Sequence, residues 1–142
     1  MGCAGIDAIV ATSPVNVTYF TGYHNWLAGQ FKDFMVRPGG NGDLLPTFGL
    51  YPAEGAPALV VDAALTVNAM DIEGLELRPV GGAMLDRAGG VAVLTRRQRE
   101  VYELLAAGPL EQTAVQVPAA LLQARGLERG RVGLEIEGMP AG

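Results

Sequence analysis

The chain has 142 residues but only one cysteine, Cys3, and one histidine, His24. A single cysteine excludes an internal disulfide and a cysteine-rich zinc site, and a single histidine excludes a metal site built from several imidazoles. Charged residues are also scarce, at 18% of the chain, whereas 49% is hydrophobic. This composition is typical of a globular domain with a buried core and not of a disordered segment.

The charge balance narrows the set of partners. The formal net charge of -5 argues against nucleic acid, because a basic surface supplies most of the affinity for it. The one cluster of positive charges is Arg96-Arg97-x-Arg99, which we interpret as the solvated face of a helix rather than a phosphate site. No apolar run approaches the roughly 18 residues of a membrane span, and no apolar leader precedes Cys3, so we expect a cytoplasmic protein without membrane contacts.

The order of apolar runs, glycines and prolines predicts an α/β domain. A buried strand over residues 6–11 leads into a helix over 14–21, with Ser13 as its N-cap, Pro14 at its first position and Gly22 as its left-handed C-cap. Strands over 44–51 and 58–62, joined by a short turn, predict an antiparallel hairpin. The other predicted elements are a short helix over 65–70, a strand over 75–80, helices over 96–107 and 118–125, and a strand over 131–136.

Few side chains offer catalytic or metal-binding chemistry. An imidazole can act as a general base or a metal ligand, but the simplest interpretation of His24 is an ordinary loop histidine. Glu135 and Glu137 lie two residues apart on the last predicted strand and so share one face. Two such carboxylates could bind a hard cation, which needs several converging oxygens. An exposed strand edge is the simpler interpretation. Asp71, Glu73 and Glu76 are interpreted as a solvated acidic turn.

The segment from Tyr23 to Arg37 combines aromatic and polar side chains in a long connection. Trp26 together with Tyr23 offers a flat apolar surface, and Arg37 offers bidentate recognition of an anion. We interpret the segment as a binding or interface surface. The alternative is a loop that folds onto its own sheet and buries its aromatic rings.

Three segments resemble parts of the N-terminal domain of the creatinase/prolidase family. The first is Asp7-Ala8-Ile9-Val10-Ala11-Thr12-Ser13-Pro14-Val15-Asn16-Val17-Thr18-Tyr19-Phe20-Thr21-Gly22-Tyr23, which resembles a strand that ends in Ser-Pro and runs into Asn-Val-x-Tyr-Leu-Thr-Gly-Phe. The second is Pro52-Ala53-Glu54-Gly55-x-Pro57-Ala58-Leu59-Val60-Val61. The third is Leu121-Leu122-x-x-Arg125-Gly126-Leu127 with Gly130-Arg131-Val132-Gly133-Leu134-Glu135. Their order and spacing hold over residues 6–137.

The resemblance implies a ribonuclease-H-like α/β fold with a mixed sheet and flanking helices. The family's helix before the first strand, and its helix and strand after Glu135, have no counterpart in this sequence. We therefore expect one domain over residues 1–142 that is truncated at both ends. In Xaa-Pro aminopeptidases, prolidases and creatinases (the M24 metallopeptidases) a catalytic "pita-bread" domain follows. That domain binds two Mn, Co or Zn ions through two Asp, one His and two Glu, which activate a water.

None of those ligands can be placed on this sequence, so the resemblance implies a chain without its own cofactor and inactive alone. Its partners would be its own catalytic domain, a second subunit and the peptide substrate. In the family a loop after the Tyr-x-Thr-Gly segment covers the partner's active site, and this is where Tyr23, His24, Asn25, Trp26 and Arg37 stand. Two alternatives remain, a peptide- or small-molecule-binding module of the same fold in a non-catalytic protein, and a free-standing small-molecule-binding domain. The substrate, whether a dipeptide, a longer peptide or a guanidino compound, stays open.

Overall fold

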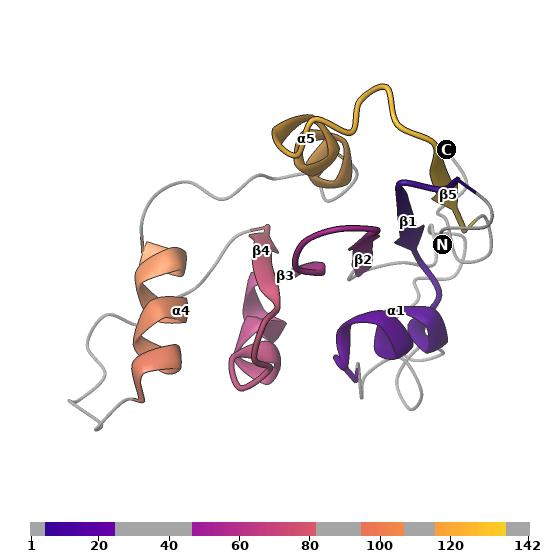
Figure 1. Ribbon diagram of the computed structural model, residues 1–142. Helices are drawn as coiled ribbons and strands as arrows, with labels where there is room; N and C mark the ends of the chain where they lie inside the picture. The colour runs from indigo at the N-terminus through magenta and orange to yellow at the C-terminus, as the bar shows by residue number, and fades with distance from the viewer. Residues whose placement is uncertain (1–4, 25–46, 82–94, 107–115, 136–142) are drawn as a thin grey trace, which may run out of the picture.

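The computed structural model describes residues 5–24, 47–81, 95–106 and 116–135 (Figure 1). Along the chain these residues form β1 (Ala8–Ala11), α1 (Pro14–Thr21), β2 (Phe48–Pro52), β3 (Ala58–Asp62), the 3-10 helix η1 (Ala63–Ala69), β4 (Glu76–Val80), α4 (Arg96–Ala106), α5 (Gln116–Ala124) and β5 (Val132–Leu134). Each helix and strand predicted from the sequence has a counterpart in the structure, with ends that differ by a few residues.

The five strands form one mixed sheet in the order β4-β3-β2-β1-β5. Strand β2 is antiparallel to both of its neighbours, β1 and β3, which confirms the predicted hairpin. The outer pairs, β1 with β5 and β3 with β4, are parallel. Four strands therefore run in one direction and β2 runs in the other.

Helices cover both faces of the sheet, with α1, η1 and α4 on one side and α5 on the other (Figure 1). Alternate residues of β3 serve the two faces, as the pleat of a strand requires. Leu59 and Val61 belong to the apolar cluster under α1, η1 and α4, and Ala58 and Val60 belong to the cluster under α5. The near-continuous apolar run of β3 is thus explained by burial on both faces.

Helix α1 approaches the sheet closely because β2 carries Gly49. A Cβ atom at Gly49 would lie 3.2 Å from Cγ2 of Thr21 and 3.7 Å from Cα of Val17. Val17 and Thr21 are the buried residues of α1. The predicted caps are confirmed, because the hydroxyl of Ser13 accepts from the Asn16 N–H and Gly22, at φ 72°, donates its N–H to the carbonyl of Thr18.

Two predictions about charged residues need correction. Glu76 does not lie in a solvated turn but in β4, where its carboxylate pairs with Arg78 at 2.6 Å and with Arg125, directly after α5, at 2.5 Å. Hydrogen bonds and charge from these two arginines outweigh partial burial and lower the pKa of Glu76. Asp71 and Glu73 are exposed, as predicted.

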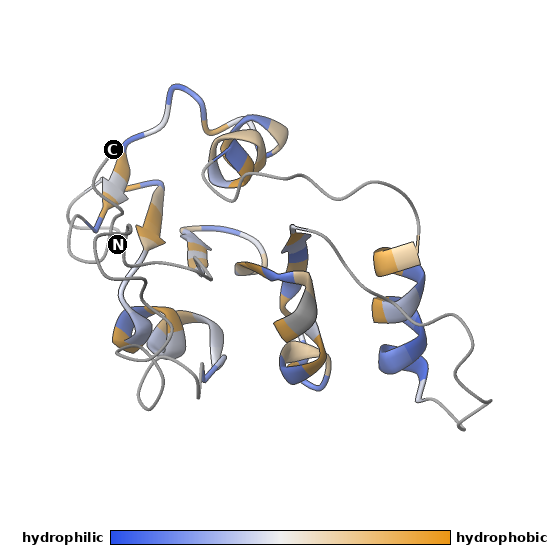
Figure 2. Cartoon of the chain, turned by 180° about the vertical axis from the view of Figure 1, so that it is seen from behind, coloured by the Kyte–Doolittle hydropathy of each residue, from blue (hydrophilic) through white to orange (hydrophobic). Residues whose placement is uncertain are grey.

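The arginine cluster that begins α4 is only partly the solvated face that was predicted. Arg96 is exposed and pairs with Glu100 one turn along the helix. The guanidinium of Arg97 instead donates to the carbonyls of Met70, at 3.1 Å, and Leu75, at 2.9 Å. Figure 2 shows the corresponding end of α4 in the hydrophilic colour and the other end in the hydrophobic colour.

Candidate functional site

The carboxyl ends of the four parallel strands lie at one edge of the sheet, where a ligand-binding site is expected. In open α/β sheets, ligands bind in the crevice outside the carboxyl ends of the strands. Residues 12 and 13 follow β1 at this edge, Asp62 ends β3, and Glu135 follows β5. Helix α1 starts from the same edge, directly after β1.

The carboxylate of Glu135 is the centre of a dense hydrogen-bond network at the N-terminus of α1. Its Oε2 accepts from the backbone N–H groups of Thr12, at 2.8 Å, and Ser13, at 2.9 Å. Its Oε1 accepts from the Ser13 hydroxyl and from Nδ2 of Asn16, both at 2.6 Å. One side chain after β5 thus receives three hydrogen bonds from the turn that joins β1 to α1 and a fourth from the first turn of α1. We call this network the Glu135 latch.

The latch determines what Glu135 can do chemically. Partial burial alone would raise the pKa of Glu135, but the hydrogen bonds from Ser13, Thr12 and Asn16 outweigh it and lower the pKa to about 2. The group is therefore an anion at neutral pH with its oxygens already engaged, which makes it a poor general acid and a poor cation ligand. Glu135 does follow β5, the edge strand of the sheet, but its carboxylate is held by hydrogen bonds within the domain. Glu137 lies outside the described residues.

A second set of hydrogen bonds holds the other end of α1. The hydroxyl of Thr18 lies 2.8 Å from the carbonyl oxygen of Pro14 and 2.9 Å from that of Tyr23. The hydroxyl of Thr21 donates to the carbonyl of Val17 at 2.6 Å and accepts from the N–H of Tyr23 at 3.1 Å. The backbone that follows the helix is therefore fixed by side chains of the helix itself.

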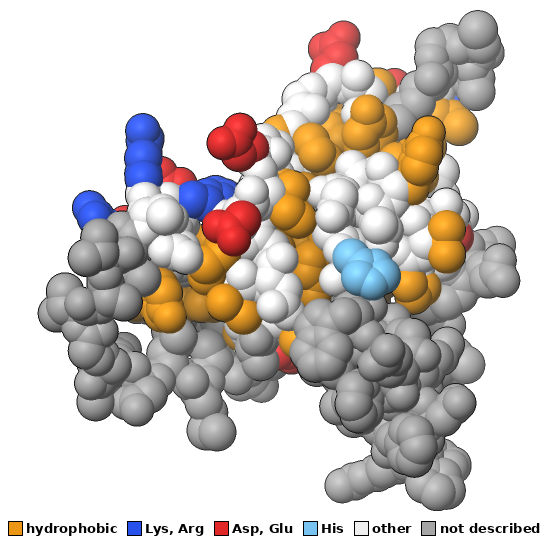
Figure 3. Space-filling model, turned by 90° about the horizontal axis from the view of Figure 1, so that it is seen from below, with side chains coloured by type: hydrophobic (Ala, Val, Ile, Leu, Met, Phe, Trp, Pro, Cys, Tyr) orange, Lys and Arg blue, Asp and Glu red, His pale blue; other side chains and the backbone are white. Residues whose placement is uncertain are grey.

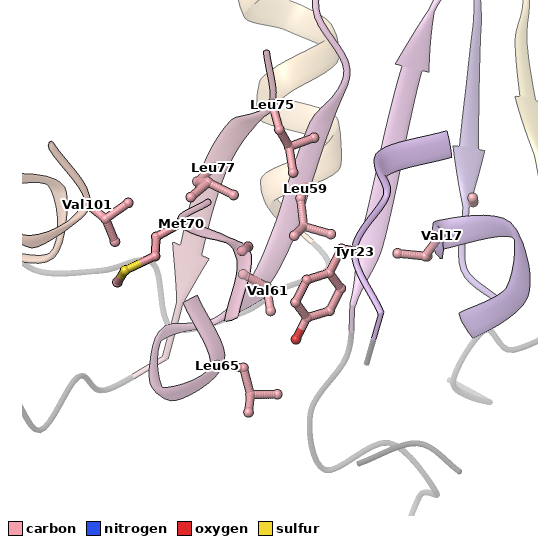
Figure 4. Packing of buried hydrophobic residues seen from close by; sticks show 11 residues of the cluster. Val17, Tyr23, Leu59, Val61, Leu65, Met70, Leu75, Leu77 and Val101 are labelled. Atoms are coloured by element: carbon pink, nitrogen blue, oxygen red, sulfur yellow. The ribbon is translucent and has the colours of Figure 1, made fainter. Parts of the chain in front are cut away.

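Tyr23 is a core residue. Its side chain is only 1% exposed and points into the cluster that contains Leu59, Val61 and Leu65 (Figure 4). Its buried hydroxyl has no hydrogen-bond partner, although Asn68 lies near it, and burial raises the pKa of this group. The prediction that Tyr23 offers a flat surface for binding is wrong, because the ring is enclosed by its own domain.

His24 is the first residue after this anchor, and it is exposed. The view from below in Figure 3 shows its side chain at the surface, with hydrophobic side chains nearby. Asn25, Trp26 and Arg37, the other predicted residues of the covering loop, lie outside the described residues. Of the five predicted site residues, the structure thus describes one buried anchor and one exposed imidazole.

An exposed aromatic cluster lies on α1 and β2. The rings of Tyr19 and Phe20 meet edge to face at 5.3 Å, and Phe20 stacks on Tyr51 of β2 at 5.2 Å. Tyr19 is 81% exposed and Tyr51 is 37% exposed, and α1 has no charged residue. Exposed aromatic rings without charge are typical of the centre of a protein interface. We call Tyr19, Phe20 and Tyr51 the aromatic cluster.

Sequence reasoning missed both the latch and the aromatic cluster. A signal for the latch existed in Ser13 and Asn16, which can cap a helix and hydrogen-bond an acid, but nothing local pointed to Glu135 as that acid. For the cluster, the signal was Tyr19, which lies on the side of α1 opposite to the buried Val17 and Thr21. Within the ranges described, no group of three His, Cys, Asp or Glu residues is placed to hold a metal ion.

Comparison with protein-family models, curated proteins and solved structures gave no match. None of the helices in the described part of the chain is long and apolar enough to cross a membrane.

Proposed function

We propose that this chain is a non-catalytic N-terminal domain of the creatinase/prolidase type. In this proposal it belongs to a dimetal hydrolase similar to Xaa-Pro peptidases and prolidases, contributes dimer contacts and supplies a segment that covers the active site of the partner subunit. The sequence segments that suggest the family are far apart in the chain, so the proposal depends on how they are arranged in space.

The observation that carries the proposal is that the three segments form one continuous structural unit. The first segment forms β1 and α1, and the second forms the end of β2, the hairpin turn and most of β3. The third forms the end of α5 and all of β5. Strands β3, β2, β1 and β5 are neighbours in the sheet. Glu135, the last residue of the third segment, accepts hydrogen bonds from Ser13 and Asn16 of the first. A five-stranded mixed sheet with helices on both faces is also compatible with a ribonuclease-H-like fold.

The proposal assigns the chemistry to a catalytic domain and not to this chain. Two divalent metal ions bound by such a domain would activate a water for attack on an amide. Glu135 and Glu76 do not fit that role, because their oxygens are held by hydrogen bonds and ion pairs within the domain. The chain would contribute an anchor for the covering segment, which follows the buried Tyr23 in the sequence.

The aromatic cluster favours a second candidate, a peptide- or small-molecule-binding module of the same fold in a non-catalytic protein. Tyr19, Phe20 and Tyr51 present an uncharged surface that can stack on a peptide or a flat ligand. Such a module would need no metal ligands anywhere in the protein. The two candidates therefore differ in what the gene encodes after residue 142.

The test is to sequence the gene past codon 142 and to express the complete protein that it encodes. We expect a downstream domain with two Asp, one His and two Glu as metal ligands, and hydrolysis of Xaa-Pro peptides when Mn²⁺, Co²⁺ or Zn²⁺ is supplied. In that enzyme, Trp26→Ala and Arg37→Ala should raise KM while the midpoint of urea unfolding stays unchanged. A downstream domain without the ligands would favour the binding module, and a stop codon directly after codon 142 would refute the proposal.

A further inference from the structure

Helix α1 is too short to hold its shape alone. It spans the eight residues Pro14–Thr21, about two turns, and isolated helices of this length are not stable in water. Val17 and Thr21 are buried and Phe20 packs partly buried against the same cluster, so two turns of helix contribute three side chains to the core. The conformation of α1 must therefore depend strongly on the hydrogen bonds at its two ends.

Those two ends are connected through one side chain. The Glu135 latch fixes the turn before the helix and the first-turn residue Asn16. The Thr18 hydroxyl then shares its proton between the carbonyl of Pro14 in the first turn and the carbonyl of Tyr23 after the helix. A shift of the first turn would move Pro14 and change which carbonyl Thr18 can reach. The backbone at Gly22 and Tyr23 would respond.

We propose that Glu135 is a positioning residue that acts through α1 and Thr18 to set the direction in which the chain leaves Tyr23. The residues that follow Tyr23 begin with the exposed His24 and include the predicted covering segment. The consequence for a partner's active site rests on the proposed function, whereas the coupling between Glu135 and Tyr23 is a property of this chain alone.

Such coupling has a physical basis in the size of the helix. The N- and C-termini of α1 are about 12 Å apart, and a hydrogen-bonded helix of two turns moves as one body. Coupling along such a path is demonstrated when the effect of one substitution depends on the other, as in a double-mutant cycle. Glu135 and Thr18 are the two side chains to vary.

Amide hydrogen exchange, measured by NMR on the full 142-residue chain, provides the test. Glu135→Gln keeps the size of the side chain but removes its charge and one acceptor. The matched control is Glu128→Gln, which removes the same charge from an exposed position in the turn before β5. In Glu135→Gln we expect exchange at Thr12 and Ser13 to accelerate about tenfold or more, and exchange at Gly22 and Tyr23 to accelerate at least threefold.

The same experiment separates coupling from simple destabilisation. In a Thr18→Val background, which keeps the branched shape and removes the hydroxyl, Glu135→Gln should no longer change exchange at Gly22 and Tyr23. Acceleration confined to Thr12 and Ser13 would overturn the proposal. Equal acceleration at Leu59 in β3 would overturn it as well, because the effect would then be one of global stability.

A milder variant keeps the test usable if Glu135→Gln does not fold. Asn16→Ala removes one of the four donors to Glu135. It should accelerate exchange at Gly22 and Tyr23 in the same direction by a smaller factor, and no change there would overturn the proposal. Because no catalytic domain takes part in any of these measurements, their failure would leave the proposed function standing, and its failure would leave them unaffected.

Discussion

Neutralising Glu135 should destabilise the domain in a way that depends on pH. The carboxyl has an ordinary pKa of 4.5 and a pKa of about 2 in the folded protein. As the pH falls, the unfolded chain therefore binds this proton before the folded chain does. The stabilising contribution is complete above about pH 4.5 and is lost progressively as the pH falls from there toward 2.

The structure sets the size of the effect. A pKa lowered to about 2 would correspond to at most about 3 kcal/mol of stability at neutral pH. The carboxylate is only partly shielded from water, so solvent screening reduces this to about 1–2 kcal/mol. For a domain of this size, Glu135→Gln should therefore lower the Tm by about 3–8 °C at pH 7.

Thermal unfolding followed by circular dichroism at pH 7, 5, 4 and 3 measures the effect. The difference in Tm between the wild type and Glu135→Gln should be similar at pH 7 and 5 and should shrink below pH 4.5. Glu128→Gln, which lacks such contacts, should track the wild type at each pH. A difference that stays constant down to pH 3, or an equal loss in Glu128→Gln, would refute the assignment of four charge-assisted hydrogen bonds to Glu135.

Three further substitutions test other parts of the structure. Tyr23→Phe should leave the free energy of unfolding unchanged or raise it by up to about 1 kcal/mol, because the buried hydroxyl has no hydrogen-bond partner. A loss of more than about 1 kcal/mol, measured by urea unfolding, would contradict this. Gly49→Ala should lower the free energy of unfolding by about 1–3 kcal/mol, because the new Cβ atom would press on α1. Its control is Gly133→Ala, whose Cβ atom would have ordinary contact distances and should be tolerated. Equal midpoints of urea unfolding for the two variants would count against the close approach of α1. Arg125→Met should raise the pKa of Glu76 in an NMR titration, because it removes a hydrogen bond and a positive charge from that carboxylate, and an unchanged titration would exclude the ion pair in solution.

Local signals explain why so much of the fold could be predicted. The start and end of α1 depend on Ser13, Pro14 and Gly22, which act within a few residues of themselves. The hairpin of β2 and β3 depends on a short turn between two apolar runs. Such interactions are visible in a sequence because the partners are neighbours in it.

The candidate site depends on partners that are distant in sequence. Glu135 and Thr12 are 123 positions apart, and they meet only because β5 pairs with β1. Glu76 and Arg125 are 49 positions apart and meet because α5 packs on the face of β4 that carries Glu76. The hydrophobic periodicity predicted each strand but not which strands pair in the sheet. The hydrogen-bond partners of Glu135 and Glu76 therefore could not be inferred from the sequence.

Tyr23 shows a different limit. Its neighbours His24 and Asn25 are polar, so the local composition favoured a surface loop. The ring is nevertheless buried, because the caps of α1 turn the chain back toward the apolar cluster at the position of Tyr23. Burial of a single aromatic residue after a helix depends on the exit direction of the chain, which the hydrogen bonds of Thr18 and Thr21 determine.

The hydrogen bonds around Glu135 argue for a positioning rather than a reactive role of this carboxylate. A reactive acid or base needs a pKa near the working pH and an unoccupied lone pair or proton. Glu135 fails both conditions, because its pKa is about 2 and its oxygens accept four hydrogen bonds from the start of α1. Tyr23, which ends the same hydrogen-bonded unit, is enclosed in the core. These hydrogen bonds are directed at the two ends of one short helix, which is the arrangement that the proposed coupling between Glu135 and Tyr23 requires.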